Sequence, residues 1–207
     1  MNINTILETS TDIPNFGNNK IKRFTNDKYD LIIKFFNNDN SIKQEREVYF
    51  IEYLSDNGVT CIPKLFAYSF EKKYTIFHFI DGSSSKTELD LSAILPFANF
   101  INLINNKLDH KNYKYNAIDS AYSDKEHFHN VYQRLSLYIE FAKKNNDLDY
   151  EKKIFNNCKI FLDKYFDENK PLSSSKNEII LSPSDFGIHN SIFNNNMYYF
   201  IDFEFAG

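Results

Sequence analysis

The chain has 207 residues, of which 42% are apolar and 25% are charged, as in a globular protein with one sizeable core or two small lobes. Its net charge of −4 argues against nucleic-acid binding, which usually needs a basic surface. The two cysteines, Cys61 and Cys158, match neither a metal-binding motif nor a disulfide framework. The first ten residues lack the apolar core of a signal peptide, and no run approaches the roughly 18 apolar residues of a membrane span. We therefore expect a cytoplasmic protein without a nucleic-acid or membrane partner.

The first 80 residues alternate strand patterns with one helical pattern. Alternating, β-branched and aromatic residues predict four strands, at 20–24, 29–36, 62–70 and 74–80. Within 44–56 apolar side chains recur at helical spacing, which predicts a helix that ends before Asn57-Gly58. Lys34 is a charged residue inside the apolar second strand.

A serine-containing break at 81–88 separates this region from a helical one. Periodic apolar residues then predict helices over 91–108, 126–144 and 151–165. Strand patterns return at 178–181, 191–193 and 197–203, with an Asn-Asn-Asn turn between the last two. We therefore expect an α+β fold with a mixed lobe over residues 1–80, a hinge at 81–88 and a mainly helical lobe over 89–207.

The strongest chemical pattern is an aspartate and an asparagine in one loop, followed by an aspartate in a later strand. Asn190 lies five residues after Asp185, and Asp202 lies twelve residues after Asn190. Phosphoryl transfer uses such residues, because a carboxylate can orient an acceptor hydroxyl while oxygen ligands hold Mg²⁺. Asp202 lies in an apolar strand, where an unpaired carboxylate is costly, so we expect a metal ion or a hydrogen-bonded partner beside it. We expect His189 to have a structural role.

Residues 181–207, ending in Tyr-Phe-Ile-Asp-Phe-Glu-Phe-Ala-Gly, resemble the catalytic end of the aminoglycoside phosphotransferase and choline kinase family. The resemblance implies a protein-kinase-like two-lobed fold, in which the terminal β-hairpin carries the catalytic loop. It also implies that Asp185 is the catalytic residue and that Asn190 and Asp202 bind Mg²⁺.

The first third of the chain resembles the nucleotide site of the same family. Lys34 resembles the strand lysine that contacts the α- and β-phosphates of ATP, and Glu47 resembles the helix residue that pairs with this lysine. Taken alone, Lys34 could instead be a strand lysine whose ammonium reaches water, and Glu47 a solvated helix residue. Gly17 lies where the family has its nucleotide loop. The family's hinge, whose backbone hydrogen-bonds adenine, resembles Phe77, His78, Phe79 and Ile80.

Three features depart from the family pattern. The nucleotide loop has the single glycine Gly17, which weakens the case for phosphate binding by backbone N–H groups. Pro183-Ser184 stands where many members have His-Gly. The chain ends at Gly207, directly after the metal-binding strand, where members continue with further helices. We expect the helical lobe to be incomplete, because the chain is a fragment, the product of a split gene or a degenerate paralogue.

Together the patterns predict a Mg²⁺-dependent transfer of the ATP γ-phosphate to a hydroxyl of a sugar, an amino alcohol or an aminoglycoside. The alternative is a kinase-like protein that binds nucleotide or serves as a scaffold without catalysis. A third hypothesis is an interaction module without a nucleotide site. The sequence leaves open which acceptor is used, whether ATP or GTP is preferred, and the oligomeric state.

Overall fold

The structure is a computed structural model that describes residues 2–14, 19–37, 41–84, 91–106, 108, 113–118, 120, 121, 123–145, 157, 158, 160, 164 and 180–207. It divides into two compact units, one formed by Met1–Ile118 with Ile180–Gly207 and the other by Asp119–Ile179. The lobe boundaries expected from the sequence stay a prediction. Among the described residues, none of the helices combines the length and apolar character that crossing a membrane requires.

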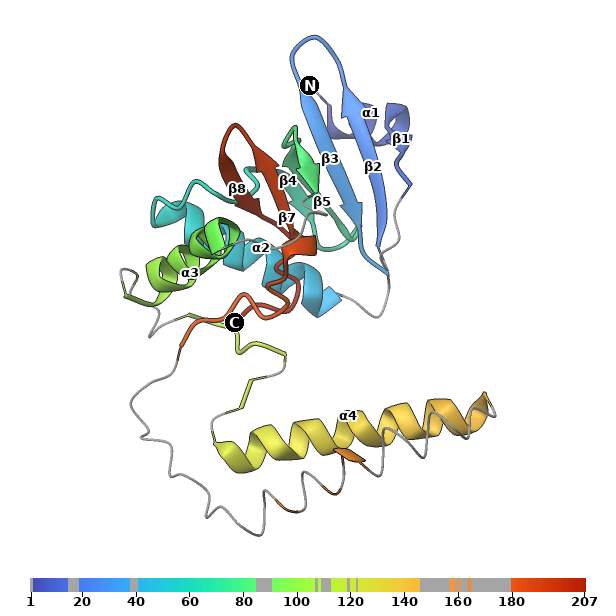
Figure 1. Cartoon of the computed structure of the whole chain (residues 1–207). Helices are drawn as coiled ribbons and strands as arrows, with labels where there is room; N and C mark the ends of the chain where they lie inside the picture. Colours follow the sequence, from blue (N-terminus) through green and yellow to red (C-terminus); the bar gives the residue numbers. More distant parts are fainter. Residues whose placement is uncertain are drawn as a thin grey trace. The chain divides into compact units, whose positions relative to one another are not determined.

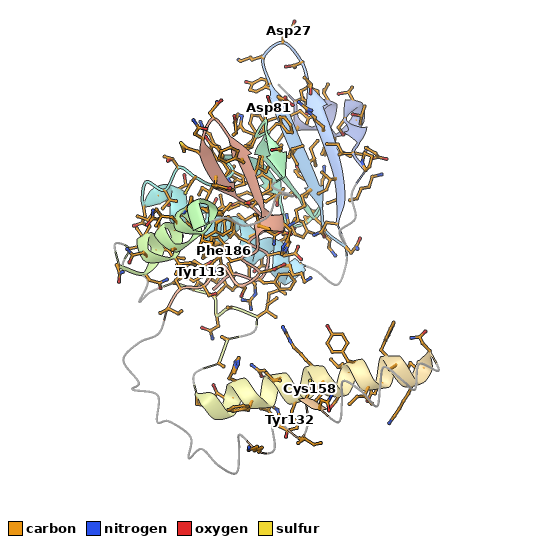
Figure 2. All side chains as sticks on the ribbon, viewed as in Figure 1. Asp27, Asp81, Tyr113, Tyr132, Cys158 and Phe186 are labelled. Carbon is orange, nitrogen blue, oxygen red and sulfur yellow. The ribbon has the colours of Figure 1, made fainter. Side chains whose placement is uncertain are left out.

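A five-stranded antiparallel sheet with the order β1-β2-β3-β5-β4 forms one part of the first unit (Figure 1). Its strands are β1 (Thr11–Asp12), β2 (Lys20–Thr25), β3 (Asp30–Phe35), β4 (Leu65–Ser69) and β5 (Tyr74–His78). The last four confirm the four predicted strands, although β4 begins at Leu65 rather than at residue 62. At the tip of the β2–β3 hairpin, next to Asp27 in Figure 2, the side chain of Asn26 accepts hydrogen bonds from the N–H groups of Lys28 and Tyr29.

The two faces of this sheet carry different residues, because successive side chains of a strand point to opposite sides. On the α1 face, the helix α1 (Ile3–Thr9) packs its fully buried Ile6 against an apolar cluster of Phe24, Leu31, Ile33, Tyr74 and Ile76. On the opposite, α2 face, the register pairs Lys34 with Thr75 and Ile32 with Phe77.

The helix α2 (Ser41–Asp56) covers that second face with one buried stripe: Gln44, Glu47, Val48, Phe50, Ile51 and Leu54. This confirms the predicted helix and extends it by three residues at its start. At its end, Gly58 adopts a left-handed φ of 77° and donates to the carbonyl of Ser55, while Val59 donates to Leu54. Glycine fits this position because it tolerates positive φ without steric strain.

The helix α3 (Leu91–Asn106) and the C-terminal hairpin complete the larger core of the first unit. The hairpin strands β7 (Ser191–Asn194) and β8 (Met197–Phe200) are antiparallel, and Asn195 and Asn196 turn between them at positive φ. This confirms the predicted Asn-rich turn, although Asn194 belongs to β7. β6 (Ser83–Ser84), in the expected hinge, pairs with β7 to form a three-stranded sheet. The aromatic rings of Phe97, Phe100, Phe186, Phe200 and Phe203 pack together in this core.

Two strand predictions fail in part of their range. Ile180 and Leu181 are not in a strand, because a helix side chain satisfies this backbone: Asn105 of α3 accepts from the N–H of Leu181 at 2.8 Å and donates to its carbonyl at 3.0 Å. The last strand ends at Phe200 rather than at residue 203, because Asp202 adopts a left-handed φ of 65° that no strand allows.

The described part of the second unit is mainly the helix α4 (Asp124–Lys144), which confirms the helix predicted over 126–144. Ser123 caps its start by accepting from the N–H of Glu126, and Lys143 and Lys144 lie in its last turn. The helix predicted over 151–165 lies largely outside the described residues.

Candidate active site

Lys34 lies at the centre of the candidate site. The alternation of β3 directs its side chain to the α2 face, where the residue is only 7% exposed. Its Nζ lies 3.1 Å from Glu47 Oε2 and 2.6 Å from Asp202 Oδ1, although Asp202 is 168 residues away in the sequence. A buried ammonium group is costly unless anionic partners compensate for its lost hydration. The structure thus brings together three of the residues that the sequence pattern singled out.

Glu204 is a further member of this cluster, and the sequence analysis assigned it no role. It is 5% exposed, and its Oε2 lies 3.3 Å from Lys34 Nζ. Lys43 of α2 contacts its Oε1 at 3.2 Å, and Asn19, directly before β2, donates to Oε2 at 2.8 Å. No clear signal in the sequence marks Glu204, because its position depends on the left-handed backbone at Asp202.

The backbone after β8 aims both carboxylates at Lys34. Asp202 lies in the left-handed region, which costs about 1–3 kcal/mol for a residue other than glycine and persists only when its surroundings enforce it. Phe203 supplies that enforcement, because it is 1% exposed and its ring lies 5.0 Å from that of Phe50. With the ring held in the core, the flanking Asp202 and Glu204 face the ammonium group.

The cluster has more negative than positive groups. If every group were ionised, Glu47, Asp202 and Glu204 would carry three negative charges against two positive charges on Lys34 and Lys43. Burial opposes the charged form of Lys34, but the three carboxylates hold its pKa above the ordinary value. Burial, reinforced by the other carboxylates, raises the pKa of Glu47 to about 7 despite its attraction to Lys34. Burial would also raise the pKa of Glu204, but the two lysines and its hydrogen bonds hold it below the ordinary value.

The loop with Asp185 is fixed by its backbone and by one buried ring. The N–H of Phe186 donates to the carbonyl of Ser184 at 2.8 Å, which closes a three-residue turn centred on Asp185. The ring of Phe186 packs against the aromatic core (Figure 2). Asn190, 8% exposed, donates from Nδ2 to the carbonyl of Asp185 at 2.8 Å. The carboxylate of Asp185 is therefore presented on a fixed loop with its side chain 52% exposed.

Asn190 and Asp202 offer the oxygen ligands that Mg²⁺ prefers. The N–H of Ile201 donates to the carbonyl of Asn190 at 2.9 Å, so the two segments run side by side next to Asp202. Because Nδ2 of Asn190 is held by the loop, its Oδ1 is the end of the amide that can serve as a ligand. The side chain of Asp202 is 39% exposed. Within the described part of the chain, no three His, Cys, Asp or Glu residues form a group that could hold a metal ion.

The expected hinge follows β5. Phe77 is 6% exposed and packs in the core, whereas the N–H groups of His78 and Phe79 donate to the carbonyls of Lys64 and Asp30, both at 2.9 Å. These two N–H groups are therefore engaged within the protein. Gly17, expected in the nucleotide loop, lies outside the described residues.

No protein-family model and no curated protein matches the sequence. Solved structures do resemble the chain. The streptomycin–ATP complex of APH(2")-IIa matches with a TM-score of 0.58 and 19% identity, over 99% of this chain and 69% of that one. The ADP-bound aminoglycoside phosphotransferase APH(2'')-Ib matches with a TM-score of 0.55 and 19% identity, over 95% and 66%. Choline kinase LicA from Streptococcus pneumoniae matches with a TM-score of 0.52 and 16% identity, over 96% and 63%.

The chain has the fold of the aminoglycoside phosphotransferases and choline kinases. This confirms the expected protein-kinase-like fold class. The chain spans about two thirds of the length of these proteins, since it covers 69%, 66% and 63% of them. At 16% and 19% identity the likeness concerns the fold, and the substrates of these proteins do not follow from it.

Proposed function

We propose that the chain is a phosphotransferase that moves the γ-phosphate of ATP to a hydroxyl group of a small molecule. The observation that supports this most is the Lys34 ammonium group, which is buried and lies within 3.3 Å of three carboxylates. Buried ion pairs contribute little net stability, and apolar side chains of similar volume often replace them without loss. A buried cluster that carries this cost is better explained by chemistry than by folding.

Lys34 and Glu47 are proposed to position the nucleotide. Lys34 would meet the α- and β-phosphates, and Glu47 would hold its ammonium group in place at 3.1 Å. Phosphoryl transfer passes through a loose transition state, so most of the catalysis comes from positioning and from positive charge near the phosphates. A lysine fixed by a buried helix residue suits that task, because its orientation does not depend on the ligand.

Asn190 and Asp202 are the residues that would hold Mg²⁺. A bound Mg²⁺ ion would neutralise the charge on the phosphate oxygens. The cluster has three carboxylates for two ammonium groups, which agrees with this assignment, because a further cation would balance the third carboxylate.

Asp185 is proposed to orient the acceptor. Its exposed carboxylate would accept a hydrogen bond from the acceptor hydroxyl, whose oxygen forms the new bond to the γ-phosphorus. The bond from that phosphorus to the bridging oxygen breaks, ADP leaves, and the hydroxyl proton passes to Asp185. The acceptor would be a sugar, an amino alcohol or an aminoglycoside, the hydroxyl compounds that the sequence resemblance suggested.

The test uses the purified chain with Mg·ATP. Ligand at about 100 times its Kd should raise the unfolding free energy by about 2.7 kcal/mol. ATP consumption is then measured with sugars, amino alcohols and aminoglycosides as acceptors. Asp185→Ala should abolish ATP turnover but keep the thermal shift with Mg·ATP. The control variant is Asp27→Ala at the hairpin tip (Figure 2), and it should keep both the wild-type turnover and the wild-type thermal shift.

The three hypotheses give different results in this experiment. Turnover that needs Asp185 supports the phosphotransferase. A thermal shift without turnover for any acceptor replaces it with the non-catalytic nucleotide-binding protein. No thermal shift at saturating Mg·ATP leaves the interaction module.

A further inference from the structure

An imidazole lies beside the carboxylate of Asp185. His189 Nε2 is 3.3 Å from Asp185 Oδ1 and 3.5 Å from Oδ2, across four residues of the loop. The side chain of His189 is 63% exposed. This differs from the structural role expected from the sequence, because an exposed imidazole contributes little to a core.

The glycine between the two residues makes room for the ring. A β-carbon added at Gly187 would lie 2.3 Å from Cε1 and 2.4 Å from Nδ1 of His189, far inside van der Waals contact. Gly187 has a φ of −101°, which every amino acid tolerates, so the backbone does not require glycine here. Glycine therefore leaves room for the imidazole in this position, and a β-carbon here would push the ring aside.

The carboxylate of Asp185 needs such a partner. The backbone of the loop is held by the turn at Ser184 and by the amide of Asn190, but these bonds do not restrain the side chain. The contacts that the described residues make with the carboxylate oxygens are both with His189. An exposed aspartate without a partner samples several rotamers, and only some of them would point at an acceptor hydroxyl.

We propose that His189 is a positioning residue that holds the Asp185 carboxylate in one orientation by donating a hydrogen bond from Nε2–H. The inference rests on the proposed function, in which Asp185 orients the acceptor hydroxyl. His189 acts through Asp185 and needs no contact with nucleotide or acceptor. Misplacement of a catalytic group by about 1 Å can lower the rate by about 100-fold, and an exposed hydrogen bond controls only part of that.

The first test compares two substitutions of His189 in ATP turnover with an active acceptor. His189→Leu removes the donor and should lower kcat by about tenfold, with KM for ATP changed less than about twofold. His189→Gln keeps an N–H donor and should retain most of kcat. Both variants should unfold at the wild-type temperature. Wild-type kcat in His189→Leu, or an equal loss in both variants, would overturn the proposal.

Gly187→Ala moves the ring while leaving the histidine in the sequence. It should lower kcat as His189→Leu does, and combining the two substitutions should lower it no further, because both act through one contact. His127→Leu, an exposed histidine of α4, is the matched control and should keep wild-type turnover. A Gly187→Ala variant with wild-type kcat would contradict the inference.

The two proposals fail in different ways. Turnover that is lost in Asp185→Ala but intact in His189→Leu removes the positioning role and leaves the phosphotransferase. A wild-type chain without turnover for any acceptor overturns both.

Discussion

The two faces of the five-stranded sheet are built from the same strands but differ in character: one is apolar and the other holds a charged cluster. On the α1 face, Ile6, Leu31, Ile33 and Ile76 are fully buried and apolar, as in an ordinary core. On the α2 face, Lys34 is buried among carboxylates. Because neighbouring residues of one strand point to opposite sides, the strand β3 supplies Leu31 and Ile33 to the apolar face and Lys34 to the charged face.

The comparison shows where stability and chemistry are separated in this fold. Apolar burial on the α1 face stabilises the sheet by roughly 1.5–3 kcal/mol per large side chain. The buried charges on the α2 face add little to the free energy of unfolding, because each charge loses its hydration when it meets its partner. The apolar face therefore allows the opposite face to hold a charged site.

The largest expected effect comes from breaking the charged face. Lys34→Met should lower the unfolding free energy by about 3–5 kcal/mol, because it leaves Glu47 and Glu204 buried without their shared cation. Urea unfolding in metal-free buffer measures it. Adding Glu47→Leu should recover part of the loss, and a double variant less stable than Lys34→Met would show that Glu47 is not coupled to Lys34.

On the apolar face, Ile76→Ala should lower the unfolding free energy by about 2–5 kcal/mol through lost burial and the cavity left behind. The thermal shift produced by Mg·ATP should stay at its wild-type size, because Ile76 faces away from Lys34. Ile42→Ala, at a residue 50% exposed on α2, is the control and should change stability by no more than about 0.5 kcal/mol. Loss of the Mg·ATP shift in Ile76→Ala would mean that the two faces are not independent.

A smaller effect is expected from Gln44, a neutral polar residue of the α2 face. Its Nε2 donates to the carbonyls of Ser69 at 3.1 Å and Tyr74 at 2.8 Å, and the residue is fully buried. Gln44→Leu should cost about 1–3 kcal/mol of unfolding free energy by leaving these carbonyls without the donor. Gln133→Leu on the exposed side of α4 should be nearly neutral, and equal losses in both would contradict this account.

The smallest effect concerns pH and sharpens the account of Glu47. Its folded-state pKa of about 7 lies above the ordinary 4.5, so between these pH values the folded chain keeps a proton that the unfolded chain has released. In metal-free buffer the unfolding free energy should therefore fall as pH rises from 4.5 to 7. Glu47→Gln should flatten this slope, and a slope as steep as in the wild type would assign the proton to another group.

Most long elements were predictable from local patterns, and the short ones were not. α2 was predictable from its helical stripe and from the stop at Gly58, and the β7–β8 hairpin from its Asn-rich turn. α1 has seven residues and β6 has two, which is too short for a periodic signal. Such elements form because tertiary contacts, such as the burial of Ile6 against the sheet, stabilise them.

The candidate site divides in the same way. Lys34 and Asp202 could be singled out as charged residues in apolar stretches of the sequence, and Glu47 through the family resemblance. The contact of Glu204 with Lys34 and that of His189 with Asp185 could not be predicted, because both depend on the path of the backbone. A left-handed residue before a buried Phe203 turns Glu204 towards Lys34, and a glycine lets the imidazole fold back over the loop.

By itself the sequence determined the order of the long strands and helices, the alternation that separates the two faces of the sheet, and the residue types able to transfer a phosphate. Only the tertiary structure decided which charges meet. Lys34 and Asp202 are 168 residues apart, and their contact forms only when the apolar cores have packed and excluded water. Local propensity acts over a few residues, whereas burial acts on every surface that the folded chain brings together.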